Sequence, residues 1–401
     1  MTGAAKASSL VVDHAARRAP GLKIALIDPS LFTIPYDAKL AGALGELGHC
    51  VTVYGEARRP GEEPTEFKRL RPLFYPELLR LGTAHWTRPA VRLAKGALHW
   101  RAMRRLVDDL LTTSPDIIHF QWSPLPAVDR LFLRKLRRLA PVVLTAHDSH
   151  PFNGTPSRLQ HLGAIGILRE FDSVIVHTEE AQARLSSFGV PAGRLVRIPH
   201  GPLYEAHPVA TYEVKSAERV RFLLFGKLKH YKGADVLIEA FRRLPPYLQA
   251  RIEVQIVGKP YMDVTPLHEA ALGLGAGVRL DFRFVSDDEM NHLLGQTDVI
   301  VFPYREIDIS GVLMAALCHG RPIIASRIGG FAELLVDGRH GLLVPPDDAG
   351  ALATAMAQLC AQPQVRLTMG AAVAELGTAI PGWDDIARRT TELYYTLLRT
   401  G

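Results

Sequence analysis

The sequence predicts an α/β protein of two domains, each built around a parallel sheet with helices on both faces. The chain has 401 residues, which exceeds one ordinary domain and suits two of roughly 150–200 residues each. Short apolar runs alternate with helical stretches along nearly the whole chain, as in parallel strands joined by crossover helices. The alternation pauses at a polar segment with two prolines, residues 202–219, which we interpret as an interdomain linker.

The first domain is expected over residues 22–201. Residues 22–28 form a short apolar run of the kind found in parallel strands buried on both faces, and residues 38–47 are typical of a helix that ends at Gly48. Further strands are expected at residues 51–54, 117–120, 142–145, 174–177 and 195–198. Residues 1–21 lack the apolar core of a secretory signal, so we interpret them as a flexible N-terminal tail.

The second domain is expected over residues 220–382, where the alternation restarts with a strand at 221–225 and a helix at 234–243. Further strands are expected at residues 252–257, 279–284, 299–302, 322–325 and 341–344. Open parallel sheets bind ligands at the carboxyl ends of their strands, because loops and helix N-termini converge there. We therefore expect a ligand cleft between the two domains.

The composition indicates a folded protein. Hydrophobic residues make up 47% of the chain and charged residues 22%. No apolar run reaches the roughly 18–20 residues that a membrane-spanning helix needs. The cysteines Cys50, Cys318 and Cys360 are widely spaced and form neither a metal pattern nor a disulfide framework. A reducing cytoplasm therefore fits best, with no resident metal expected.

Positive charge is concentrated in the first half of the chain. Residues 1–200 hold 27 Lys and Arg against 18 Asp and Glu, and residues 68–105, the basic stretch, hold ten basic residues and one acid, Glu77. Apolar residues such as Trp86 and Trp100 are interleaved with them. A basic amphipathic helix can lie on an anionic membrane, but the same pattern suits a solvated helix whose apolar side faces the core. Nucleic acid is not expected as a partner, since no nucleic-acid motif accompanies the charge.

The strongest local signal is FGKLKHYKG, residues 225–233, between a strand and a helix. It places Lys227, Lys229 and Lys232 within six residues, with Gly226 and Gly233 near the two ends. Glycines allow a close approach of backbone to a ligand, and clustered ammonium groups suit a diphosphate. A solvated lysine-rich loop is the alternative.

A second signal follows the strand at residues 299–302. A polar loop with Glu306 and Asp308 leads to an apolar helix that Gly311 opens. The amides of Ser310, Gly311 and Val312 would be unpaired donors at the helix N-terminus and would favour an anion. The alternative is that Asp308 or Ser310 caps the helix, and both roles can hold at once.

These motifs give the second half a family resemblance. The segments FGKLKHYKGADVLIEAF, VQIVGKP, DVIVFPYREIDISGVLMAALCHGRPIIAS, RIGGFAELLVDGRHGLLVPPDD and GWDDIARRTTELYYTLL resemble the GT-B glycosyltransferases of family 4. The first half is similar more loosely, through IIHFQW, VVLTAHDSHP, DSVIVHTEEAQARL and VRIPHG. The resemblance implies two Rossmann-like domains facing across a cleft. It also implies that residues 383–401 form a helix that crosses back to the first domain.

The resemblance implies a donor site in the second domain. It places the donor diphosphate on Lys227 and Lys232, next to Gly226 and Gly258. The family's acid that contacts the donor sugar falls at Ile307, so its neighbours Glu306 and Asp308 are both candidates. The family's second glutamate, which binds the nucleotide ribose, falls at Ala315 and is absent.

In the first domain, the resemblance implies that His147, in TAHDSHP, lies near the transferred sugar and the acceptor. Asp148 could orient it, and both His147 and His150 could instead be ordinary loop residues. We expect His200 to line the hinge or the cleft. Tyr36 and Asp37 are candidates for the acceptor side.

The expected activity is a retaining transfer of a hexose from a nucleotide-diphosphate sugar, without a cofactor or metal. The acceptor could be a lipid-linked saccharide at the inner face of a membrane, reached through the basic stretch, or a soluble small molecule. Two other classes stay open. One is an epimerase or phosphorylase on the same fold, and the other is a non-catalytic nucleotide-sugar-binding partner, motivated by Ala315.

Overall fold

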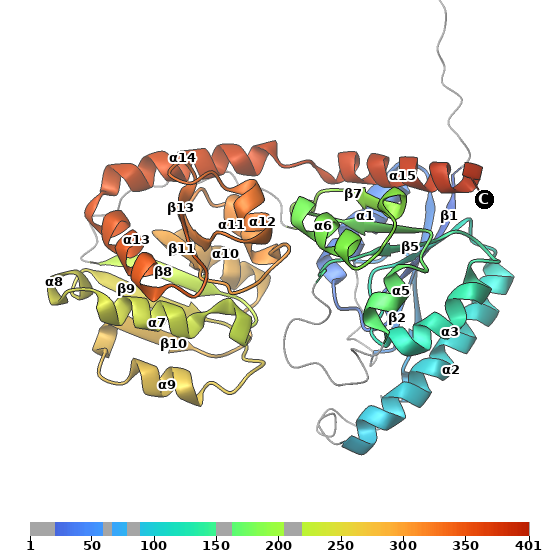
Figure 1. The fold of residues 1–401 in the computed structure, drawn as a ribbon, viewed down its shortest axis with the longest axis horizontal. Coiled ribbons are helices and arrows are strands. Elements are labelled where there is room, and N and C mark those ends of the chain that lie inside the picture. The colour runs from blue at the N-terminus through green and yellow to red at the C-terminus, as the bar shows by residue number, and fades with distance from the viewer. Residues whose placement is uncertain (1–20, 59–65, 78–88, 150–162, 204–218, 401) are drawn as a thin grey trace, which may run out of the picture.

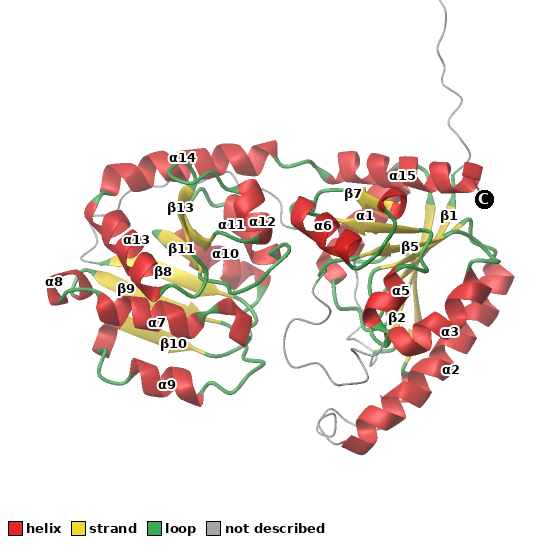
Figure 2. Cartoon of the chain, viewed as in Figure 1, coloured by secondary structure: helices red, strands yellow, loops and turns green. Residues whose placement is uncertain are grey.

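The computed structural model describes residues 21–58, 66–77, 89–149, 163–203 and 219–400. It contains two α/β domains that lie side by side, and the C-terminal helices run along one edge of both (Figure 1). Figure 2 shows helices around both sheets. The two-domain α/β architecture expected from the sequence is confirmed.

The first domain holds a seven-stranded parallel sheet in the order β3-β2-β1-β4-β5-β6-β7. Its strands are β1 (Lys23–Ile27), β2 (Cys50–Glu56), β3 (Leu70–Phe74), β4 (Ile117–Phe120), β5 (Val142–Thr145), β6 (Ser173–Val176) and β7 (Leu195–Arg197). Its helices are α1 (Ile34–Glu46), α2 (Pro89–Thr113), α3 (Pro126–Leu136), α5 (Ala164–Leu168), α6 (Glu179–Ser187) and the 3-10 helix η3 (Ala192–Arg194). The strand order reverses between β1 and β4, which opens a crevice at their carboxyl ends.

The second domain holds a six-stranded parallel sheet in the order β10-β9-β8-β11-β12-β13. Its strands are β8 (Val220–Phe225), β9 (Ile252–Val257), β10 (Val278–Asp281), β11 (Val299–Phe302), β12 (Ile323–Ser326) and β13 (Gly341–Val344). Its helices are η4 (His230–Lys232), α7 (Ala234–Arg243), α8 (Pro246–Gln249), α9 (Thr265–Ala271), η5 (Gly275–Gly277), α10 (Asp287–Gln296), α11 (Gly311–Leu317), α12 (Gly329–Leu334), α13 (Ala349–Ala361) and α14 (Pro363–Ala379).

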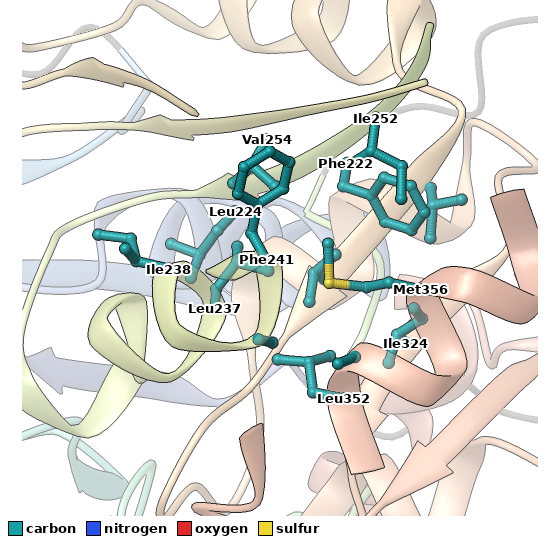
Figure 3. Packing of buried hydrophobic residues seen from close by; sticks show 14 of the residues in the cluster. Phe222, Leu224, Leu237, Ile238, Phe241, Ile252, Val254, Ile324, Leu352 and Met356 are labelled. Atoms are coloured by element: carbon teal, nitrogen blue, oxygen red, sulfur yellow. The ribbon is translucent and has the colours of Figure 1, made fainter. Parts of the chain in front are cut away.

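Apolar side chains fill the space between the second sheet and its helices. Phe222 and Leu224 of β8 pack with Leu237 and Phe241 of α7 and with Met356 of α13 (Figure 3). All five are at most 1% exposed. Burying side chains of this size stabilises the fold by about 1.5–3 kcal/mol each, so this core holds the cleft-facing loops on a rigid base.

The last helix, α15 (Trp383–Thr400), returns to the first domain, as expected (Figure 1). Ile386, Ala387 and Tyr394 are fully buried in an apolar cluster with residues of β1 and α1. The Tyr394 hydroxyl lies 2.7 Å from Nδ1 of His119, on β4. The chain end is thus part of the core of the first domain.

The structure corrects several predictions about the individual helices and strands. Helix α1 begins at Ile34 rather than at residue 38, because Pro35 lies in the first turn, where its missing N–H is not needed. Part of the basic stretch forms the strand β3 at the edge of the sheet. Its Arg71 and Pro72 are exposed, and edge strands accept charged residues and proline because one side of the strand has no neighbouring strand. Strand β10 ends at Asp281, three residues earlier than expected.

The predicted tail and linker lie almost wholly outside the described residues. Within the described part of the chain, none of the helices combines the length and the apolar character that crossing a bilayer would require.

Candidate active site

A cleft of about 1060 Å³ lies between the two domains. Its walls are the loops that follow the carboxyl ends of β1, β4 and β5 in the first domain and of β8, β9 and β11 in the second. Residues from the first domain include Tyr36, Trp122 and His147, and residues from the second include Lys229 and Glu306. The predicted location of a ligand cleft therefore agrees with the structure.

The loop after β8 places a buried cation beside the cleft. Lys232 is 5% exposed, and its Nζ donates a hydrogen bond of 2.6 Å to the Tyr304 hydroxyl. Burial, followed by the charges of Lys229 and Lys227, lowers the pKa of Lys232 to about 7. Within the described residues, no carboxylate is paired with this ammonium group. A buried cation that has only a neutral partner is an unfavourable arrangement that an anionic ligand would relieve.

Two glycines make room for this loop. Gly226 has φ 119°, and a Cβ there would lie 3.0 Å from Nζ of Lys232 and 3.1 Å from the Val312 side chain. Gly258, with φ 145°, packs directly on Gly226, because a Cβ there would lie 2.0 Å from the Gly226 carbonyl oxygen. Gly258 therefore joins the ends of β8 and β9 rather than lining the cleft.

Lys227 reaches across to the other domain. Its side chain is exposed, and Nζ lies 5.0 Å from the centroid of the Phe32 ring, in the first domain. Partial desolvation, together with the charges of Lys229 and Lys259, lowers the pKa of Lys227. The loops after β8 and β9 therefore make the second-domain side of the cleft electropositive.

The structure distinguishes the two acids that the sequence left as candidates. Glu306 is half-buried and lines the cleft, and within the described residues its carboxylate has no hydrogen-bond partner. Asp308 also lines the cleft, but it is 2% exposed and its carboxylate already accepts hydrogen bonds from the Ser149 amide and from Arg184, at 2.9 Å, both in the first domain. Glu306 is therefore the acid with capacity for a sugar hydroxyl.

The start of α11 is an N-cap, as the alternative interpretation held. The Ser310 hydroxyl accepts a hydrogen bond of 3.3 Å from the Leu313 amide. Gly311 lines the cleft, whereas Ser310 and Val312 lie behind its wall. Ala315, at the position where the family has its second glutamate, is 1% exposed and belongs to the core.

His147 lies in an aromatic cluster on the first-domain side. Its ring stacks on Trp122 with centroids 5.4 Å apart and meets Tyr36 edge-on at 4.6 Å. Nε2 lies 2.8 Å from the side-chain oxygen of Gln121, so it carries the proton and Nδ1 is left as an acceptor. Burial, and then the neighbouring His177 imidazole, hold the pKa of His147 well below its ordinary value, so the ring is neutral.

The other residues that the sequence suggested near His147 are Asp148, His150 and His200. Asp148 and His200 both line the cleft, and Nδ1 of His200 donates to the Gly201 carbonyl over 2.7 Å. His150 lies outside the described residues.

Of the two residues suggested for the acceptor side, Tyr36 lines the cleft and Asp37 does not. Asp37 is fully buried beside Asp28, and burial followed by the charge of Asp28 raises its pKa well above the ordinary value. The Thr33 hydroxyl donates to the Asp37 carboxylate at 3.3 Å and accepts from Nε1 of Trp122 at 3.1 Å. Asp37 therefore supports the aromatic wall from behind.

Sequence reasoning missed Phe32, Gln121 and Trp122 as cleft residues. Gln121 and Trp122 directly follow β4, so their place at a strand's carboxyl end was an available signal. It also missed Arg184, whose helix gives no indication of a partner 124 residues away.

Solved structures with this architecture define the class of protein. The Anabaena protein HepE in complex with UDP superposes with a TM-score of 0.71 at 18% sequence identity, over 94% of this chain and 100% of that one. WaaG, a glycosyltransferase involved in lipopolysaccharide biosynthesis, superposes with a TM-score of 0.69 at 16% identity, over 92% of this chain and 99% of that one. These likenesses establish that the chain has the GT-B fold.

Sequence comparison gives the family. The Glycosyltransferase Family 4 model matches residues 38–201, and the Glycosyl transferases group 1 model matches residues 219–362. The two matches together span most of the chain, which is a glycosyltransferase of the GT-B, family 4 group.

Named relatives agree with this assignment. The D-inositol 3-phosphate glycosyltransferase of Streptomyces bingchenggensis is 27% identical over 59% of this chain, and the chain spans 56% of that relative's length. The phosphatidyl-myo-inositol mannosyltransferase of Mycobacterium leprae is 29% identical over 76% of this chain and 79% of its own length.

Proposed function

We propose that this glycosyltransferase moves a hexose from a nucleoside-diphosphate sugar to an acceptor hydroxyl, with retention at the anomeric carbon and without a divalent metal. The observation that carries the proposal is the group of lysines after β8 and β9: Lys227, Lys229, Lys232 and Lys259. Burial, and then the charges of neighbouring lysines, lower the pKa of Lys227 and Lys232, so the group favours a polyanion such as a diphosphate. HepE, with the same fold, binds UDP and UDP-glucose, which supports a nucleotide sugar as donor.

The lysines have a defined task in this reaction. When the bond between the anomeric carbon and the β-phosphate oxygen breaks, negative charge develops on the phosphate. Lys227 and Lys232 would stabilise that charge, the diphosphate replacing the Tyr304 hydroxyl as the partner of Lys232. The acceptor oxygen attacks the same face of the sugar, forms the new glycosidic bond and passes its proton to the leaving phosphate. These cations thus perform the function that a divalent metal has in other transferases.

The two walls of the cleft would hold the sugar. Glu306 can accept hydrogen bonds from sugar hydroxyls on the donor side. Neutral His147 can accept one at Nδ1 from the opposite wall, because Gln121 orients its ring. The aromatic surface of Trp122 and Phe32 beside it suits a saccharide or other ring-bearing acceptor.

The acceptor is proposed to be lipid-linked and held at an anionic membrane surface by α2. Trp100 on this helix is 41% exposed, and the Arg104 guanidinium lies 5.0 Å from its ring centroid. An exposed Trp beside arginines suits the membrane interface. Binding to phosphatidylglycerol vesicles that weakens with salt and with the Trp100→Ala change would support this acceptor. An absence of binding to vesicles would favour a soluble small-molecule acceptor.

A thermal-shift screen against UDP, GDP, ADP, CDP and dTDP sugars, with and without EDTA, tests the donor site. We expect one nucleotide to raise Tm selectively and the rise to persist in EDTA. A rise that requires a divalent cation would refute the metal-free site.

Donor turnover then separates a transferase from other classes. Release of nucleoside diphosphate in the presence of an acceptor, with the same anomeric configuration in product and donor by NMR, supports the proposal. Tight binding without any turnover would instead assign a non-catalytic binding partner. Conversion of the donor sugar without loss of the nucleotide would assign an epimerase.

A further inference from the structure

The two domains are joined by a reciprocal pair of helix caps. The Glu333 carboxylate, on α12, accepts hydrogen bonds of 2.9 Å from the amides of Glu179 and Glu180, at the start of α6. The Glu180 carboxylate in turn accepts a hydrogen bond of 2.8 Å from the Gly329 amide, at the start of α12. Each domain therefore supplies an anion to the N-terminus of a helix in the other, where unpaired amides and the helix dipole favour it.

An ion pair between Arg184 and Asp308 lies near these caps, and Asp308 lines the cleft. Arg184, on α6, donates from Nη1 to Asp308 at 2.9 Å and to the Ser149 hydroxyl at 2.8 Å. The second carboxylate oxygen of Asp308 accepts from the Ser149 amide. Asp308 is 2% exposed, and Ser149 is also 2% exposed, so water screens this contact less than it screens a surface pair.

This ion pair lies between the two loops that the proposed reaction uses. Ser149 is two residues after His147, in the loop that follows β5. Asp308 is two residues after Glu306, in the loop that follows β11. The Asp308 carbonyl also accepts a hydrogen bond of 2.7 Å from the Gly330 amide of α12, so the cap and the ion pair share one anchor.

We infer that Arg184 and Asp308 are positioning residues, which fix the His147 loop against the Glu306 loop, and that Glu180 and Glu333 hold the two domains in the arrangement seen here. The role of Asp308 is thus to set the distance between the two walls, and Glu306 alone of the two acids contacts the sugar. The inference rests on the proposed function for its kinetic consequence but not for its conformational one.

The conformational test is small-angle X-ray scattering of the full chain, with no ligand needed. We expect Glu333→Gln and Asp308→Asn each to increase the radius of gyration, since each removes a charge that joins the domains. The matched control is Glu239→Gln, which removes a surface carboxylate whose partners in the described part of the chain are Arg242 and Arg243, on its own helix. A radius unchanged in both interdomain variants would overturn the inference.

The kinetic test separates positioning from sugar contact. Asp308→Asn is expected to lower kcat about tenfold or more while KM for the donor stays within about threefold, because misplacement of reacting groups slows chemistry. Glu306→Gln is expected to raise KM as well. Arg184→Lys keeps a cation near Asp308 and should recover most of the kcat that Arg184→Gln loses.

Two kinetic outcomes would contradict the inference. A loss of donor affinity in Asp308→Asn that matches its loss of kcat would make Asp308 a sugar contact. Additive losses in the Arg184→Gln and Asp308→Asn double variant would show that the two side chains act independently. If the wild-type chain turns over no donor, the proposed function is wrong. The scattering experiment would still test whether the interdomain contacts hold the two domains together.

Discussion

At the residue scale, Lys232 shows what sequence and structure each contribute. Its place after a strand and before a glycine made it a candidate for phosphate binding, and the family resemblance implied that role. The burial of Lys232 depends on the fold. So does its hydrogen bond to the hydroxyl of Tyr304, which lies 72 positions away in the sequence. The sequence could not separate Glu306 from Asp308, because both acids lie in the same loop and their difference is a contact with the other domain.

Removal of the Lys232 ammonium group should abolish most of the proposed charge stabilisation. We expect Lys232→Ala to reduce turnover by a factor of about 100 or more. Lys135→Ala, which removes an exposed lysine from the last turn of α3 that does not line the cleft, serves as the control in the same steady-state assay. Near-normal turnover in Lys232→Ala would remove the diphosphate assignment.

The pH dependence of ligand binding follows from the same group. The pKa of Lys232 is about 7 in the ligand-free protein, against an ordinary value of 10.5. An anion favours the charged form and raises this pKa, so nucleoside-diphosphate affinity should fall as pH rises above about 7. Titration calorimetry in buffers of different ionisation enthalpy should detect proton uptake on binding near pH 8. Uptake that persists in Lys232→Ala would have to come from another group.

Protein stability should change in the opposite direction with pH. The unfolded chain binds a proton at Lys232 up to about pH 10.5, whereas the folded chain releases it near pH 7. The unfolded state therefore binds more protons between these values, and the contribution of Lys232 to the free energy of unfolding rises with pH across that window. Urea unfolding at pH 7 and pH 9 should show a smaller rise in Lys232→Ala than in wild type.

At the element scale, the strands were predictable and their ends were less so. Apolar runs bounded by turn residues identify parallel strands without knowledge of their neighbours. Strand β3 escaped prediction because its Arg71 and Pro72 suit an edge that only the assembled sheet defines. The start of α1 was misjudged because Tyr36 and Asp37 look polar or exposed in sequence, yet both are buried.

The glycine that ends the lysine loop provides a test of element geometry. Gly233 has φ 67°, and a Cβ there would lie 1.9 Å from the Pro303 carbonyl oxygen. Gly233→Ala should therefore lower the free energy of unfolding by about 1–3 kcal/mol or more. Gly42→Ala, within α1 and with no atom within 4 Å of the new Cβ, should instead stabilise by about 0.5–1 kcal/mol in the same urea titration. Equal effects of the two changes would contradict this geometry.

At the scale of the whole molecule, the last helix connects the chain end to the centre of the first sheet. Tyr394 bonds to His119 on β4, and Nε2 of His119 lies 2.8 Å from the Thr145 hydroxyl at the end of β5. Strand β5 leads directly into the loop of His147. Helix α15, at the end of the chain, thus supports the wall of the cleft that the first domain contributes.

Loss of that hydroxyl should be measurable. We expect Tyr394→Phe to lower the free energy of unfolding by about 1–3 kcal/mol, because it leaves a buried His119 nitrogen without its partner. Tyr247→Phe, at a tyrosine that is 67% exposed, should change stability little. Equal stability of Tyr394→Phe and wild type in denaturant titration would mean that His119 finds another partner.

The sequence by itself determined the two parallel sheets, the cleft between them and the lysine loop after β8, because these depend on local hydrophobic pattern and on residues close together in the chain. Only the tertiary structure decided that Glu306 faces the cleft, that Asp308 pairs with Arg184, and that Asp37 is buried away from the cleft that Tyr36 lines. The physical reason is that burial and ion pairing of a side chain depend on its neighbours in space. For Asp308, those neighbours belong to the other domain.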